Sequence, residues 1–229
     1  MSAGPLIDRK LRYLQLIVVV LSVVFAAIVL NMQHKQAPEI NGAILAEPQP
    51  LAAFELRNHR GELVHTADLK GEWQLVSYGY TQCPDICPTM LSSLAQFQKR
   101  LDRSGEYRDL RVLFYTIDPS RDTVDKLANY VPWFDARFVG LRAESADEAL
   151  IFERSLGMSS FLTTVDEADG TGAAEYDVAH GFRLYLLDDQ ARLRAALAPI
   201  SERDGSKHYN PESLFSDYIA LREWFARQG

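Results

Sequence analysis

The chain has 229 residues, enough for one large domain with an appendage or for two small domains. Its 47% hydrophobic and 24% charged residues are typical of a folded protein, and a net charge of −7 with no basic stripe argues against nucleic-acid binding. The two cysteines are too few for a disulfide scaffold, so this close pair favours catalysis, redox switching or soft-metal binding.

The first apolar segment, residues 13–33, contains no charged side chain. A helix needs about 20 such residues to span a bilayer. A cleaved signal peptide would have a shorter apolar core, about 7–15 residues, followed by a small-x-small cleavage site that is missing here. We therefore expect a transmembrane anchor.

The flanking charges predict the orientation of this anchor. Three basic side chains precede it: Arg9, Lys10 and Arg12. Only Lys35 follows it, so the positive-inside rule keeps residues 1–12 in the cytoplasm. The remainder then lies across the inner membrane, which in a bacterium is the periplasm, where a cysteine pair tends to oxidise.

Residues 34–50 contain three prolines and little periodicity, which predicts a linker. The folded domain is then expected over residues 51–229. It opens with a strand, a glycine turn and a second strand over residues 54–64. A long polar stretch with two glycines, residues 163–173, predicts a loop or hairpin tip.

Strand and helix patterns alternate along most of this domain. The expected strands are residues 75–80, 111–117, 138–141, 182–187 and 193–197. The expected helices are residues 88–101, a helix capped by Ser120 or Asp122 that runs to about Phe134, one from Ser145 to about Leu156, and residues 211–227. This order around a cysteine pair at a strand–helix junction predicts a thioredoxin-like α/β fold.

The cysteines, Cys83 and Cys87, lie where the buried strand ending at Tyr80 gives way to a helix. Pro88 suits the first helical position, because its missing N–H would have no helical partner there. The pair therefore lies at the positive end of a helix dipole. That end favours thiolate over thiol, so we expect at least one thiol pKa to be lowered.

The spacing is C-x-x-x-C rather than the C-x-x-C of ordinary thioredoxin-like redox proteins. In a helix it places both sulfurs on one face, one turn apart. Two soft sulfurs favour Cu(I), with zinc as a competitor, and a third ligand should come from elsewhere. Four of the five histidines lie at the membrane edge or in polar turns. His180 lies at the entry to an expected strand, where its position alone favours a polar loop role over a ligand role.

The segment from Gly79 to Thr89, GYTQCPDICPT, resembles the copper-binding loop of the Sco/SenC family. The DPSRDT stretch at residues 118–123, the Phe54-x-Leu56 opening with Gly61, and the histidine preceding the next strand are also similar. The resemblance covers the chain from about residue 51. Family members are membrane-anchored, thioredoxin-like copper chaperones that help to mature the dinuclear copper site of cytochrome c oxidase.

This resemblance implies that Cys83, Cys87 and His180 bind copper as Cu(I), Cu(II) or both. It implies two partners, the apo copper-bearing subunit of cytochrome c oxidase and a thiol reductant protein. One position departs from the family, which usually has Asp immediately before the histidine, where this chain has Ala179. A carboxylate there would orient the imidazole. Asp118 could contribute from a neighbouring strand end, although a turn role suits it equally.

Two other functions fit the cysteine pair. In a thiol–disulfide oxidoreductase, Cys83 would attack a partner disulfide and Cys87 would resolve the mixed intermediate, which would keep the oxidase cysteines reduced. A peroxidase of the peroxiredoxin kind would place a threonine two residues further upstream of its cysteine than Thr81 lies. His180 distinguishes the two leading hypotheses, because the chaperone needs it and the reductase does not.

Overall fold

The computed structural model describes residues 12–25, 37–158, 183–202 and 205–228. The chain divides into two compact units, Met1–Pro38 and Glu39–Gly229. The first unit contains a helix over residues 12–25. Within the described ranges, no helix has both the length and the apolar character needed to cross a membrane. The predicted anchor covers residues 13–33, and its second part, residues 26–33, lies outside the described residues.

A mixed sheet of eight strands forms the centre of the second unit, in the order β1-β8-β7-β4-β5-β6-β2-β3. Its strands are β1 Gly42–Pro50, β2 Glu55–Asn58, β3 Leu63–His65, β4 Trp73–Gly79, β5 Leu110–Thr116, β6 Val139–Arg142, β7 Leu184–Leu187 and β8 Arg192–Leu197. Strands β4, β5 and β6 are parallel neighbours, and the remaining pairs are antiparallel. A separate pair, β9 Ile200–Ser201 and β10 Lys207–His208, forms a small hairpin.

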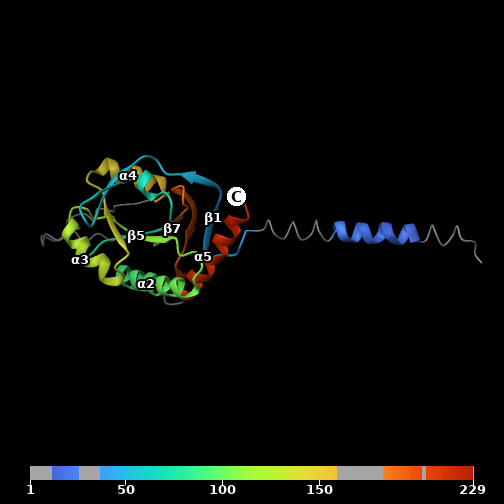
Figure 1. The fold of residues 1–229 in the computed structure, drawn as a ribbon. Helices are drawn as coiled ribbons and strands as arrows, with labels where there is room; N and C mark the ends of the chain where they lie inside the picture. The colour runs from blue at the N-terminus through green and yellow to red at the C-terminus, as the bar shows by residue number, and fades with distance from the viewer. Residues whose placement is uncertain (1–11, 26–36, 159–182, 203–204, 229) are drawn as a thin grey trace, which may run out of the picture. The chain divides into compact units, whose positions relative to one another are not determined.

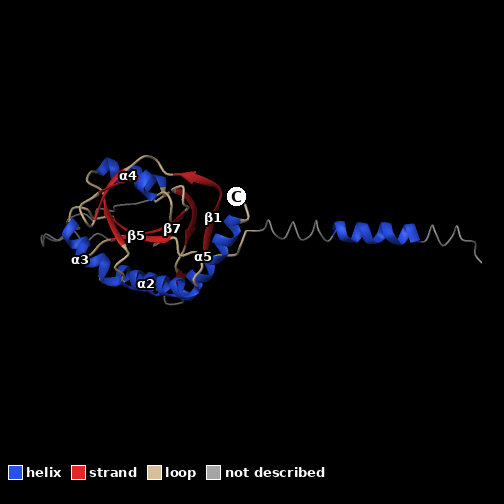
Figure 2. Cartoon of the chain, in the orientation of Figure 1, coloured by secondary structure: helices blue, strands red, loops and turns tan. Residues whose placement is uncertain are grey.

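Helices cover both faces of this sheet, as Figures 1 and 2 show. They are α2 Ile86–Ser104, α3 Val124–Phe134, α4 Ala146–Ser155 and α5 Pro211–Ala226, with a short 3-10 helix η1 at Thr66–Leu69. Helices α2, α3 and α5 lie along one side, and α4 lies along the other (Figure 1). This arrangement of a mixed sheet and helices confirms the thioredoxin-like α/β architecture predicted from the sequence.

Two hydrophobic cores result, one on each face of the sheet. Side chains alternate between faces along a strand, so neighbours in β5 belong to different cores. Phe114 packs in the core beneath α2, α3 and α5, whereas Tyr115 packs in the core beneath α4, against Phe152 at 4.9 Å between ring centroids. The side chains of Phe114, Tyr115 and Phe152 are all fully buried. The central strands are therefore rigidly packed on both sides, and they carry the loops that follow them.

Two helix starts differ from the expectation. Helix α2 begins at Ile86, which places Cys87 and Pro88 in its first turn. Helix α3 is capped by Thr123, whose side chain accepts a hydrogen bond from the Lys126 N–H, rather than by Ser120 or Asp122. The reason is that Asp122 is fully buried and its carboxylate binds other groups, as described below.

The expected linker over residues 34–50 is wrong for residues 42–50, which form the edge strand β1. This strand pairs with β8, with Gly42 opposite Leu197 and Pro50 opposite Arg192, and its register shifts between Ile44 and Gln49. Prolines are tolerated on edge strands because one row of N–H groups there has no ladder partner. The second unit accordingly begins at Glu39 rather than near Leu51.

This correction predicts that β1 is needed for stability. A soluble domain starting at Leu51 should lose about 2–4 kcal/mol of unfolding free energy relative to one starting at Glu39. The loss follows from the partly buried Ile44 and Leu45 side chains and the exposed β8 edge. Chemical denaturation of the two versions measures the difference. Equal stability, together with equal amide-exchange protection of β8, would contradict the prediction.

Candidate metal and thiol site

The two cysteines lie between β4 and the first turn of α2, and they differ sharply in exposure. Cys87 is fully buried, whereas Cys83 is partly exposed in the turn before the helix, and neither forms a disulfide. The Cys87 N–H points to the Cys83 sulfur, with 3.4 Å between N and Sγ. One sulfur can therefore be reached from solvent, and the other lies behind it within the fold.

Gly79, at the end of β4, makes room for the buried sulfur. A Cβ atom at this position would lie 2.5 Å from the Cys87 Sγ and 3.1 Å from Cε2 of Phe114. The first of these distances is far below van der Waals contact, so the sulfur packs directly against the backbone of the strand. The glycine in the GYTQC segment is thus explained by close approach rather than by a turn.

Asp122 joins the cysteine turn to the loop between β5 and α3. Its buried carboxylate accepts hydrogen bonds from the Thr81 N–H at 2.9 Å, from the Thr81 hydroxyl at 2.5 Å and from the Thr116 hydroxyl at 2.6 Å. A buried charge is tolerated only when such donors surround it. This contact explains why the DPSRDT stretch accompanies the cysteine segment, and sequence reasoning missed it by assigning Asp122 to a helix cap.

Asp118 serves the turn rather than the cysteines. Its carboxylate accepts hydrogen bonds from the Ser120 hydroxyl at 2.8 Å and from the Arg121 backbone, and it forms an ion pair with the Arg121 guanidinium. That guanidinium lies 6.0 Å from the centre of the Tyr80 ring. Of the two roles considered for Asp118, these contacts favour the turn role.

The geometry separates the acidities of the two thiols. The pKa of Cys83 falls to about 6, chiefly because the Cys87 thiol donates a hydrogen bond to its sulfur, with further help from the backbone N–H groups of residues 85–87. The pKa of Cys87 rises because its proton is used in that hydrogen bond and because the sulfur is buried beside the charge on Cys83. The pair therefore holds one proton at neutral pH, with the thiolate on the exposed side.

The predicted third ligand, His180, and its neighbour Ala179 lie outside the described residues. Among the residues that are described, no group of three or more His, Cys, Asp or Glu side chains could hold a metal ion. The structure thus brings Cys83 and Cys87 together, and the ligand role of His180 stays a prediction.

His208, which the sequence pattern places in a polar segment, lies near the start of α2. The β9–β10 hairpin packs against the start of α2, where His208 lines a small cavity with Ile86, Thr89 and Met90. The imidazole Nε2 lies 3.8 Å from Glu202 Oε1 at the surface. The hairpin thus covers the flank of the helix turn that holds Cys87.

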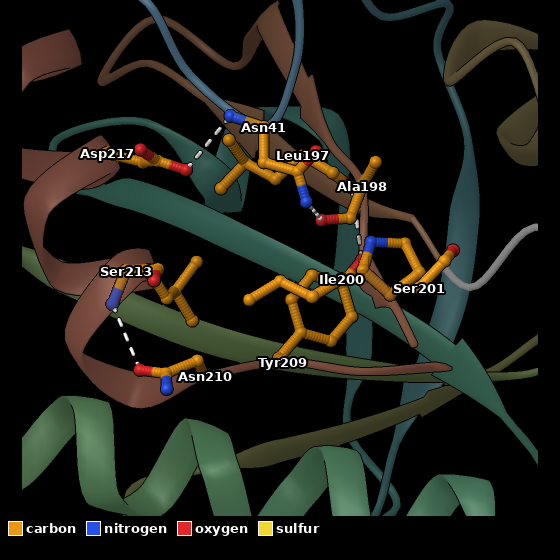
Figure 3. A pocket seen from close by; sticks show the side chains of 11 residues that line it. Asn41, Leu197, Ala198, Ile200, Ser201, Tyr209, Asn210, Ser213 and Asp217 are labelled. Atoms are coloured by element: carbon orange, nitrogen blue, oxygen red, sulfur yellow. Dashed lines mark hydrogen bonds between the residues drawn. The ribbon is translucent and has the colours of Figure 1, made fainter. Parts of the chain in front are cut away.

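A larger cavity of about 490 Å³ lies beside the start of β1, and neither cysteine lines it (Figure 3). Its polar groups bind one another: the Asn41 N–H donates to Asp217 at 3.2 Å, and the Asn41 side chain donates to the Ala198 carbonyl at 2.9 Å. Asn210 caps α5 by accepting from the Ser213 N–H at 3.2 Å. These contacts hold the edge of the sheet, so the cysteine pair is the better candidate site.

Comparison with known proteins agrees with the geometry. The family model described as SCO1/SenC matches residues 45–207. The mitochondrial SCO2 homolog of Bos taurus is 33% identical over 167 residues, covering 73% of this chain and 52% of the bovine protein. The chain therefore spans about half the length of that relative.

Two solved structures with copper bound are also similar in fold. Arabidopsis thaliana ScoI with copper bound is 25% identical, with a TM-score of 0.62, over 75% of this chain and 97% of that structure. Bradyrhizobium japonicum ScoI with copper bound is 26% identical, with a TM-score of 0.56, over 76% and 99%. Because the family model covers well over half of the sequence and the fold agrees, this chain belongs to the SCO1/SenC family.

Proposed function

We propose that this protein is a copper metallochaperone that binds copper through Cys83, Cys87 and His180. The cargo would be delivered to the copper-bearing subunit of cytochrome c oxidase, the target implied by the family resemblance. The observation that carries the proposal is the pair of free cysteines at the start of α2, with Cys83 partly exposed and Cys87 buried. Copper-bound relatives with the same fold support it.

The asymmetry of the pair suits capture and release of a metal ion. The exposed Cys83 thiolate can bind incoming copper first, and Cys87 then loses its proton to solvent as its sulfur becomes the second ligand. A neutral imidazole from His180 would complete a trigonal site acceptable to Cu(I) and Cu(II). Handover needs the partner's ligands to reach the metal, and the partly exposed side of Cys83 provides that access.

A second function, thiol–disulfide reduction, is favoured by the same difference in acidity. The Cys83 thiolate would attack a partner disulfide, forming a mixed disulfide and releasing one partner thiolate. Cys87 would then lose its proton and attack the Cys83 sulfur, releasing the second thiolate and leaving a Cys83–Cys87 disulfide. A thiol reductant protein would restore the reduced pair. This function requires no ligand from His180.

We also propose that residues 13–33 anchor the protein in the inner membrane, with residues 1–12 in the cytoplasm. A tether follows, which ends before β1. The domain would then face the periplasm, where it could meet the oxidase subunit. The basis is the uncharged apolar segment and the basic residues on only one side of it.

The ligand role of His180 is tested by two substitutions. His180→Ala should weaken Cu(II) binding severely and Cu(I) binding less, because two thiolates can still hold Cu(I). Ala179→Asp should tighten copper binding about 10–100-fold by orienting the imidazole. Competition titrations of the anaerobically reduced protein measure both effects, with oxidase assembly followed in cells.

The fully oxidised protein serves as the control, because a disulfide removes both thiolate ligands and should abolish Cu(I) binding. Normal binding of both copper states by His180→Ala, together with normal oxidase assembly, would exclude the ligand role. The reductase function would then become the preferred explanation for the cysteine pair.

The shared proton predicts a pH profile for Cys83. Its alkylation rate in the reduced protein should rise with pH and reach half its maximum near the pKa of about 6, because the thiolate is the reactive form. Cys87→Ala removes the hydrogen-bond donor and should move the midpoint to higher pH, whereas Cys87→Ser keeps a donor and should move it less. Stopped-flow alkylation measures this. A midpoint that is the same in all three proteins would show that Cys87 does not control Cys83.

A further inference from the structure

His59 is a buried histidine near the edge of the sheet, with 7% of its surface exposed. It directly follows β2, which pairs with β6 through two residue pairs, the last of them Asn58 with Leu141. The next position in this register brings His59 opposite Gly140. The His59 N–H donates to the Gly140 carbonyl at 2.9 Å, as in an ordinary antiparallel pair.

The imidazole ring makes the reciprocal hydrogen bond of this pair. The Gly140 N–H donates to Nδ1 of His59 at 2.9 Å, where a backbone carbonyl would normally accept. Because Nδ1 accepts a hydrogen bond, it carries no proton, and the proton of the neutral ring is on Nε2. This hydrogen bond therefore exists only while the imidazole is uncharged.

The space around the contact is tightly packed. A Cβ atom at Gly140 would lie 3.1 Å from Cγ2 of Val131, 3.3 Å from Cβ of Leu127 and 3.4 Å from Cβ of His59. Two apolar side chains of α3 thus cover the β6 backbone where the histidine meets it. A protonated ring has a second N–H at Nδ1, which would point at the Gly140 N–H. Two donors cannot share a hydrogen bond, so protonation breaks this contact.

The charged groups that act on the imidazole lie in its own turn. The pKa of His59 is lowered chiefly by burial and further by Arg60, against an opposing effect of Glu62. The described α3 side chains that meet at Gly140, Leu127 and Val131, carry no charge. The surroundings of the ring therefore disfavour the imidazolium form, in agreement with the hydrogen bond from Gly140.

We propose that His59 is a pH-sensitive clip, which holds the β2–β3 hairpin (residues 55–65) on β6 when neutral and releases the hairpin when protonated. Above a pH of about 6.5, the ring is neutral whether the hairpin is closed or open, so the contact is fully present. Below about 6.5, the open form takes up a proton that the closed form excludes, and opening becomes about 10-fold more favourable for each pH unit. This dependence ends at the lower pH where the closed form itself becomes protonated.

The opening should be local. Release uncovers the fully buried Leu56 side chain and leaves one edge of β6 without a partner strand. The other edge of β6 stays paired with β5, and β5 stays paired with β4. Both central strands are packed on their two faces, so their hydrogen bonds do not depend on the hairpin. The clip therefore acts on the sheet edge, and it does not depend on copper binding.

Hydrogen exchange of the full-length protein in detergent, followed by mass spectrometry, tests the clip. After correction for intrinsic exchange, peptides from residues 55–65 and 139–142 should lose protection about 10-fold per pH unit between about pH 6.5 and 5.5. Peptides from β4 and β5 should keep their protection. His59→Asn should remove this pH dependence, because its amide oxygen can accept from the Gly140 N–H and does not titrate. His65→Gln, which replaces an exposed histidine of the same hairpin, should behave as the wild type.

Equal protection of the hairpin peptides across this pH range in the wild type would overturn the proposal. A pH dependence that survives in His59→Asn would also overturn it, because another group would then be the sensor. The same is true if β4 and β5 lose protection together with the hairpin, since the whole domain would then be unfolding. If His59→Asn does not fold, the comparison of hairpin and central strands in the wild type still decides the question.

Discussion

The buried carboxylate of Asp122 is the constraint on which the site depends. It accepts three hydrogen bonds, two from Thr81 in the cysteine turn and one from Thr116 at the end of β5. Because an unpaired buried charge is very costly, these donors must stay in place whenever the domain is folded. The cysteine turn is therefore fixed to the rigid central strands, and the partly exposed Cys83 lies in that turn.

The two cysteines differ in burial. The start of α2 places Cys87 against the bare backbone of Gly79 and leaves Cys83 accessible. The Cys87 thiol donates a hydrogen bond to the Cys83 sulfur, and this hydrogen bond lowers the pKa of Cys83. The same asymmetry suits both proposed functions, metal capture and thiol exchange, so the pair alone does not distinguish them. That distinction depends on a ligand from another part of the chain.

Much of the fold could be predicted from the sequence, because buried strands and amphipathic helices produce strong periodic patterns. The strands now called β4 and β5, and helices α2, α4 and α5, were expected within a few residues of their bounds. The edge strand β1 was not, because its prolines and small residues resemble a linker. Its strand conformation comes from pairing with β8, which is more than 140 residues away in the chain. Helix capping by Thr123 was missed for a similar reason, since the neighbouring Asp122 is engaged by a distant threonine.

The sequence by itself determined the chemistry of the site: two soft sulfurs four residues apart, at the end of a strand, in a segment similar to a known copper loop. Residue identity and short-range spacing are sufficient for that conclusion. Only the tertiary structure decided which sulfur is buried and which carboxylate holds the cysteine turn. Exposure, acidity and hydrogen bonding depend on groups brought together from separate strands and helices, and no local pattern in the chain records those contacts.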